Sequence, residues 1–166
     1  MTSRGYGLAD AHGGLLHTAP VTAIGLLVLN DHVLKAMAPG PITGVLSDLA
    51  GLAFFPLLLV AFVELFRLAL GRFEGPDDHV LVTAVAATAI VFTLVQLHPA
   101  ATEAYRLGLA AVQQPFHAAR TLLEGAPARR VAATPDPLDL IALPALAVPL
   151  LVGRASLRSH RRQDAR

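Results

Sequence analysis

The sequence LAGLAFFPLLLVAFVELFRLAL at residues 49–70 decides the fold class, because it is apolar over nearly its whole length. Its first charged residue is Glu64. At a rise of about 1.5 Å per residue, a helix needs roughly 20 apolar residues to cross about 30 Å of hydrocarbon. The stretch meets this requirement and predicts a transmembrane helix.

Three further apolar stretches flank this one, at 15–38, 80–97 and 138–152. The last is short and contains Pro144 and Pro149, which remove backbone donors and predict a bent or broken helix. The sequence therefore predicts an all-α integral membrane protein, with four transmembrane helices forming a bundle in a single membrane domain that takes the whole chain.

Composition agrees with this fold class. The 166 residues are 54% hydrophobic and 15% charged, and the mean hydropathy is +0.57. Soluble domains carry about 25% charged residues, so a soluble globule is disfavoured, and high hydropathy excludes disorder. The absence of cysteine excludes disulfide frameworks and thiolate-held metals. A net charge of +1 gives no basis for nucleic-acid binding.

The first stretch has a second interpretation, as a cleaved signal peptide. Arg4 resembles the basic start of such a peptide, and Ala36, Met37 and Ala38 resemble its cleavage site. However, polar and charged residues lie between the apolar run and that site, and Pro39 follows it. We therefore expect the first stretch to be retained as a membrane helix.

Basic residues predict the orientation. The tail at 153–166 carries five arginines, and the loop after the second helix carries Arg67 and Arg72. Basic loops face the cytoplasm, and an even number of helices puts both termini on one side. The sequence therefore predicts a multi-pass protein of the inner (cell) membrane with both termini in the cytoplasm and residues 98–136 outside.

The segment 98–136 is too long for a simple turn. Residues 102–124 are typical of a helix that Pro115 breaks or kinks, and 125–127 and 132–137 are typical of loop. Two interpretations of this extra helix stay open. It is either a connector packed on the bundle or an amphipathic helix lying in the outer membrane interface.

Polar residues at the predicted helix ends are the candidate functional residues. With the topology above, they all lie at the extracytoplasmic end, where ionisable groups next to hydrocarbon are costly and therefore point to function. The candidate ligand-binding residues are Asn30, Asp31, His32, Asp48, Gln96, His98, Asp136 and Asp139. At the opposite end, Glu64 and its charged neighbours are expected to be loop and snorkelling residues.

Several of these residues also have a structural interpretation. Ser47 is a good N-cap, and Asp48 then suits the first turn of a helix. Asp136 followed by proline is a good helix start. Asp31 and Lys35 are four residues apart and can pair on a helix surface.

A shared pocket would turn these residues into a site. We expect Asp48 and Asp139 to belong to one pocket, lined also by Asp31 or His32. Carboxylates with imidazole suit a divalent metal ion, for which these four residues are the candidates. A metal-activated water there would hydrolyse an ester or phosphate, although no known metal-binding spacing occurs in the sequence.

Short motifs resemble a known group of proteins. The motifs are LNDHVLK at 29–35, TGVLSDLAGL at 43–52, FFP at 54–56 and DPLDL at 136–140. They are similar to small bacterial membrane proteins of unassigned function and, more distantly, to the VanZ-like family. That resemblance implies four helices, a bacterial cell-envelope setting and a theme of glycopeptide resistance. The corresponding positions are Asp48, Gln96, Asp136 and Asp139.

The chain also departs from the VanZ-like pattern. No glutamate stands just before Gln96, no arginine directly precedes Asp136, and no asparagine follows Asp139 within a turn. The long connection before the fourth helix is atypical as well. These departures leave the role of the corresponding positions open.

Three functions remain open from the sequence. The first is a binding or accessory protein of the cell envelope with an extracytoplasmic polar pocket. The second is a metal-dependent membrane hydrolase acting on a lipid or envelope substrate. The third is a small subunit of a larger membrane complex. Membrane lipids and other membrane subunits are the expected partners.

Overall fold

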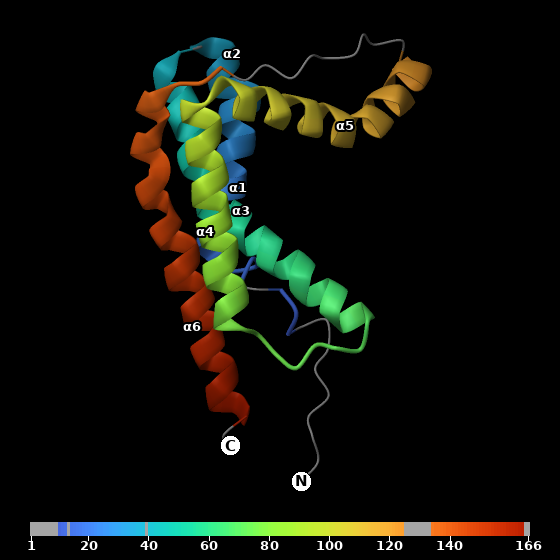
Figure 1. Ribbon diagram of the computed structural model, residues 1–166, viewed down its shortest axis with the longest axis vertical. Coiled ribbons are helices and arrows are strands. Elements are labelled where there is room, and N and C mark those ends of the chain that lie inside the picture. Colours follow the sequence, from blue (N-terminus) through green and yellow to red (C-terminus); the bar gives the residue numbers. More distant parts are fainter. Residues whose placement is uncertain (1–9, 13, 39, 125–133, 165–166) are drawn as a thin grey trace. The chain divides into compact units, whose positions relative to one another are not determined.

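The computed structural model describes residues 10–12, 14–38, 40–124 and 134–164, and every regular element in these ranges is a helix (Figure 1). The elements are α1 (Thr18–Leu29), the π-helix η1 (Asn30–Leu34), α2 (Lys35–Met37), α3 (Pro41–Ala69), α4 (Asp78–Leu97), α5 (Pro99–Glu124), the 3-10 helix η2 (Pro137–Leu146) and α6 (Ala147–Asp164). The predicted all-α class is confirmed.

Three helical segments are long and apolar enough to cross a membrane, at Pro41–Ala69, Asp78–Leu97 and Pro137–Arg162. They correspond to the second, third and fourth predicted stretches. The first stretch, at 15–38, is not among the three. It folds as α1, η1 and α2 in direct succession, and its apolar part ends at Leu29 because polar residues follow.

The chain forms two compact units. Unit 1 contains residues 1–89 and 141–166, and unit 2 contains residues 90–140. The boundaries fall within α4 and within η2, so each of these helices contributes to both units. The candidate residues are therefore divided between two separately described bodies.

The core of unit 1 is formed by packed helices. Both α1 and α6 pack against α3, and α1 also contacts α6. Leu57 and Leu81 are almost completely buried. A Cβ atom at Gly153 of α6 would lie 2.6 Å from Cδ2 of Leu81, so a larger residue there would displace the buried Leu81 side chain of α4.

Helix α3 begins eight residues earlier than the predicted stretch, at Pro41. Proline suits the first helical position, and the Gly40 amide donates to Oγ1 of Thr43 (3.2 Å), whose hydroxyl donates back to the Gly40 carbonyl (2.8 Å). Ser47 and Asp48 consequently lie inside α3. The predicted N-cap role of Ser47 and first-turn role of Asp48 are wrong, because Gly40 and Pro41 already start the helix.

The fourth predicted stretch is not a regular α-helix. It starts as the 3-10 helix η2 and becomes the α-helix α6 after Leu146, between Pro144 and Pro149. Each proline lacks the amide donor of a regular ladder, so the predicted irregularity is confirmed as a change of helix type. Helix α6 then extends to Asp164, well beyond the predicted end at residue 152.

The predicted helix over 102–124 is confirmed as α5, which begins slightly earlier at Pro99. Pro115 lies inside α5 without ending it, so the predicted break does not occur. Figure 1 shows α5 changing direction in its C-terminal part, as a proline kink would produce. Residues 125–133, which include most of the predicted loop, lie outside the described residues.

Candidate functional site

A hydrogen-bonded chain of side chains joins the end of α1 to the start of α3. The Asn30 amide donates to the Thr43 carbonyl (2.6 Å) and to Oγ of Ser47 (2.7 Å). The Ser47 hydroxyl donates to Oδ1 of Asp31 (2.8 Å), and Nζ of Lys35 lies 2.7 Å from the same oxygen. We call these five residues the polar corner.

The π-helix η1 brings the side chains of two adjacent residues to the same partner on α3. Within it, the Lys35 amide donates to the Asn30 carbonyl five residues earlier, which widens the turn. The adjacent residues Asn30 and Asp31 both reach Ser47 as a result. Single π-turns inside α-helices are rare overall and occur frequently at functional sites.

Asn30 is the unusual member of the polar corner. Its side chain is completely buried, and both of its amide protons are used on α3. Its Oδ1 atom is buried and has no hydrogen-bond partner in the described part of the chain. Leaving a buried acceptor unpaired costs about 1–3 kcal/mol, so a donor from outside the chain would be bound favourably here.

The charged members of the polar corner lie at its surface. The side chains of Asp31 and Lys35 are 42% and 41% exposed, and their predicted pairing is confirmed. An exposed pair of this kind contributes at most about 1 kcal/mol to stability. Its main effect is to present one negative and one positive group beside each other, with Ser47 fixing the carboxylate.

The other predicted residues of unit 1 lie next to the polar corner. His32 is exposed, and its Nδ1 lies 3.0 Å from the Val28 carbonyl of the preceding turn. Asp48 follows Ser47 on α3 and is half-buried. Thr43, Ser47 and Lys35 were not among the candidate ligand-binding residues. Thr43 takes part through its backbone carbonyl, which carries no sequence signal, whereas Ser47 takes part through its side chain one turn later in α3.

A second polar group, which we call the Gln96 clamp, lies in unit 2. Nε2 of Gln96 donates to Oδ2 of Asp139 (3.1 Å), and the Asp136 amide donates to Oε1 of Gln96 (3.2 Å). Oδ1 of Asp136 accepts from the Leu138 amide (2.9 Å), as the predicted helix start requires. His98 is exposed at the end of α4, and its carbonyl accepts from the Thr102 hydroxyl.

The hydrogen bonds described above group the predicted residues within each unit. Asn30 and Asp31 belong to the polar corner of unit 1, and Gln96, Asp136 and Asp139 belong to the Gln96 clamp of unit 2. The expected single pocket joining Asp48 with Asp139 extends over both units and stays a prediction. Within the described residues, no three His, Asp or Glu side chains are grouped as a metal site would require.

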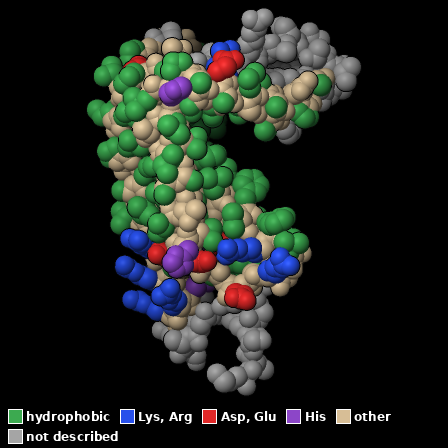
Figure 2. Space-filling model, in the orientation of Figure 1, with side chains coloured by type: hydrophobic (Ala, Val, Ile, Leu, Met, Phe, Trp, Pro, Cys, Tyr) green, Lys and Arg blue, Asp and Glu red, His purple; other side chains and the backbone are tan. Residues whose placement is uncertain are grey.

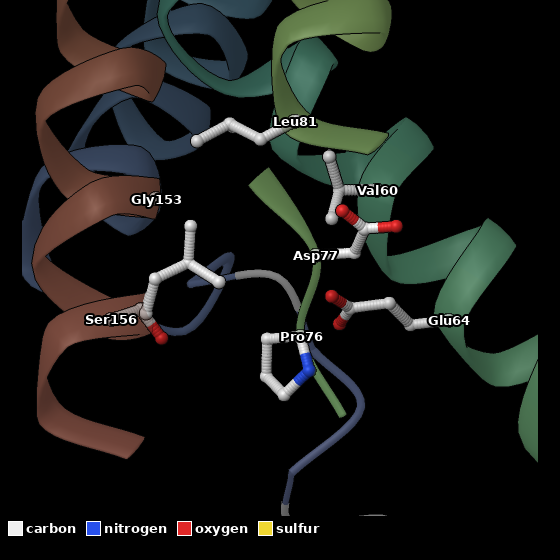
Figure 3. Close-up of a pocket in the computed structure, with 8 residues that line it drawn as sticks. Val60, Glu64, Pro76, Asp77, Leu81, Gly153 and Ser156 are labelled. Atoms are coloured by element: carbon white, nitrogen blue, oxygen red, sulfur yellow. The ribbon is translucent and has the colours of Figure 1, made fainter. Parts of the chain in front are cut away.

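The opposite end of unit 1 holds a buried carboxylate. Glu64 is only 1% exposed, so its expected role as a snorkelling or loop residue is wrong. Helix α3 continues past Glu64. The Glu64 side chain lines a small cavity together with Asp77 and with Gly153 and Ser156 of α6 (Figure 3). The cavity volume of about 10 Å³ is about the minimum that admits one water molecule.

Arginines gather at this same end of unit 1 (Figure 2). Arg67 lies 3.5 Å from Asp77, and Arg154 of α6 lies 3.4 Å from Asp78 at the start of α4. The first of these weak, exposed ion pairs joins α3 to the loop before α4, and the second joins the basic part of α6 to the start of α4. Lys35 of the polar corner is the only lysine in the chain.

Comparison of the chain with protein-family models, with curated proteins and with solved structures gives no significant match. The similarity to the VanZ-like family therefore rests on the short motifs quoted above. The function has to be argued from the polar corner and the helices that carry it.

Proposed function

We propose that this chain is a multi-pass membrane protein that binds a zwitterionic phospholipid headgroup at the polar corner. Such a headgroup carries a phosphate and an ammonium a few bonds apart. Lys35 suits the phosphate and Asp31 suits the ammonium, and this pairing of opposite charges gives specificity. The role is therefore binding or accessory rather than catalytic.

The observation that carries this proposal is the unpaired Oδ1 of Asn30. A buried acceptor next to a surface ion pair fits a ligand that brings N–H or O–H donors. The directed chain from Asn30 through Ser47 to Asp31 links the buried acceptor to the surface carboxylate. Because Oδ1 of Asn30 is buried, a bound ammonium reaches it only when the polar corner opens, and its N–H groups then satisfy both acceptors.

The topology that we propose has four crossings. Three are the long apolar helices, and the fourth is the continuous helical segment from Thr18 to Met37, which packs along α3. The basic end of unit 1 then faces the cytoplasm, and both termini lie there, in a bacterial inner membrane. The polar corner is at the opposite end of α3 and faces outside.

The alternative functions have less support. A metal-dependent hydrolase needs a ligand set, and the described residues do not assemble one. A subunit of a larger complex would cover apolar helix surface, which lipid covers equally well. Copurification of a stoichiometric partner chain would favour that third function.

The proposal is tested by measuring lipid binding to the full chain by native mass spectrometry. Phosphatidylethanolamine and phosphatidylcholine share the phosphate, but only the first carries ammonium N–H donors. We expect phosphatidylethanolamine to bind about tenfold more tightly, which corresponds to about 1.4 kcal/mol. Asp31→Asn removes the acceptor charge and should abolish that preference.

Glu103→Gln is the matched control, because Glu103 also forms an exposed pair, at 2.8 Å with Arg106, but lies outside the polar corner. This variant should keep the lipid preference. Equal binding of the two lipids by the unaltered chain would overturn the proposal. So would an equal loss of preference in both variants.

The orientation is tested separately, since the chain starts without cysteine. A cysteine introduced by Ser159→Cys, at an exposed position of α6, should be protected from a membrane-impermeant thiol reagent in intact cells. Lys35 should react with an impermeant amine reagent under the same conditions. Labelling of the Ser159→Cys variant from outside would show that the C-terminus lies outside the cell, opposite to the proposed orientation.

A further inference from the structure

Helix α5 differs in kind from the helices that are apolar on all sides. Its described side chains from 102 to 115 separate into two faces when placed at 3.6 residues per turn. The polar face takes about a third of the circumference, and it consists of Thr102, Glu103, Arg106, Gln113 and Gln114, with Ala110 as its one apolar residue. The apolar face consists of Ala104, Tyr105, Leu107, Leu109, Ala111, Val112 and Pro115.

The apolar face is largely uncovered. Leu107 is 63% exposed and Val112 is 68% exposed, and Tyr105 beside them is also exposed. Exposure of several large apolar side chains to water on one helix face is unfavourable, and such a face usually marks a site of interaction with protein or lipid. The face therefore indicates an apolar surrounding outside the described chain.

The position of α5 identifies that surrounding. It begins at Pro99, two residues after the end of α4, a helix long and apolar enough to cross a membrane. The Thr102 hydroxyl donates to the carbonyls of Val95 (2.6 Å) and His98 (3.2 Å), which fixes the corner between the two helices. Figure 1 shows α5 leaving the last turns of α4 sideways rather than extending them.

The Gln96 clamp fixes the far end of the same connection. It holds Asp136 and Asp139 against the last turn of α4, so the chain returns to the level at which α5 departs. Both ends of the connection are therefore held at the end of α4, the level at which that helix would leave the membrane. The polar face also carries a compensated pair, Glu103 with Arg106, so the interaction depends on apolar burial rather than on net charge.

We infer that α5 lies in the membrane interface, with its apolar face inserted among the lipid acyl chains and its polar face toward water. This assigns the second of the two interpretations that the sequence left open for residues 102–124. The partner is the lipid surface itself, and the insertion is independent of lipid binding at the polar corner.

The inference is tested with the full chain in vesicles of phosphatidylethanolamine and phosphatidylglycerol, using single spin-labelled cysteines. Tyr105→Cys and Val112→Cys report on the apolar face, and Gln114→Cys, at an exposed position on the opposite side of the helix, is the matched control. We expect the first two labels to collide several-fold more with oxygen than with a water-soluble nickel chelate, and the third to show the reverse.

Two outcomes would overturn the inference. High nickel accessibility at all three positions would place α5 in water. Low accessibility to both oxygen and nickel at Tyr105→Cys and Val112→Cys would mean that protein covers the face, either a second copy or another subunit. Insertion of α5 should also persist in high salt, whereas loss of insertion there would mean that charge drives it.

Discussion

The polar corner and the Gln96 clamp contain similar side chains but differ in how their hydrogen-bonding groups are paired. In the Gln96 clamp, each end of the Gln96 side-chain amide has a partner on the returning chain, within about three residues of sequence. In the polar corner, both amide protons of Asn30 are used, but its oxygen is buried without a partner among the described residues. The first arrangement closes a connection, and the second leaves a vacant acceptor.

The comparison teaches that the location of polar groups at helix ends does not distinguish a site from a structural contact. Both groups contain a carboxamide and a carboxylate next to apolar helices. Only the balance of donors and acceptors separates them, because a buried acceptor without a donor is unfavourable unless a ligand supplies one. The predictions below test whether this difference has functional consequences.

The largest loss of stability should come from packing rather than from either polar group. Gly153→Val puts side-chain atoms where Cδ2 of Leu81 lies 2.6 Å from the Cβ position, and should lower the free energy of unfolding by about 1–3 kcal/mol. Gly25→Val is the control, since nothing lies within 4 Å of its Cβ position. Unfolding in mixed micelles measures both, and equal losses would contradict the packing argument.

A smaller loss is expected when the polar corner is broken. Asn30→Leu removes one buried and one part-buried hydrogen bond of about 0.5–1.5 kcal/mol each, and partly compensates by removing the unpaired oxygen. The net decrease in unfolding free energy should be about 1–2 kcal/mol. The preference for phosphatidylethanolamine should disappear in the folded variant, as measured by native mass spectrometry. A retained preference would show that Asn30 takes no part in binding.

The smallest effect is expected from breaking the Gln96 clamp. Gln96→Leu removes two hydrogen bonds whose partners are only part-buried and therefore regain water, so the loss should be about 1 kcal/mol or less. The lipid preference should be unchanged. The nickel accessibility of a label on the apolar face of α5, at Val112→Cys, should increase. If this variant lost the lipid preference as Asn30→Leu does, the two groups would act as one site.

Particular residues show how far the sequence predicts this molecule. Hydropathy alone locates the long apolar helices, because burial of twenty apolar residues leaves few alternatives to a membrane helix. The start of α3 is not predicted, because Gly40 and Pro41 act as a helix start while the apolar run begins later. The pairing of Asp31 with Lys35 follows from helical spacing. The burial of Asn30 depends on the π-turn and on its contact with Ser47 of α3, and neither has a signature in the sequence.

The most direct test of the vacant acceptor uses the fact that Asn30 is the only asparagine in the chain. Protein labelled with ¹³C at the asparagine side-chain carbonyl gives one signal, whose chemical shift reports hydrogen bonding to Oδ1. We predict that this signal shifts between phosphatidylcholine vesicles and phosphatidylethanolamine vesicles, and that Asp31→Ala, which keeps Asn30 as the single labelled residue, abolishes the shift. An identical signal in both lipids would contradict the proposal that Asn30 receives a donor from the headgroup.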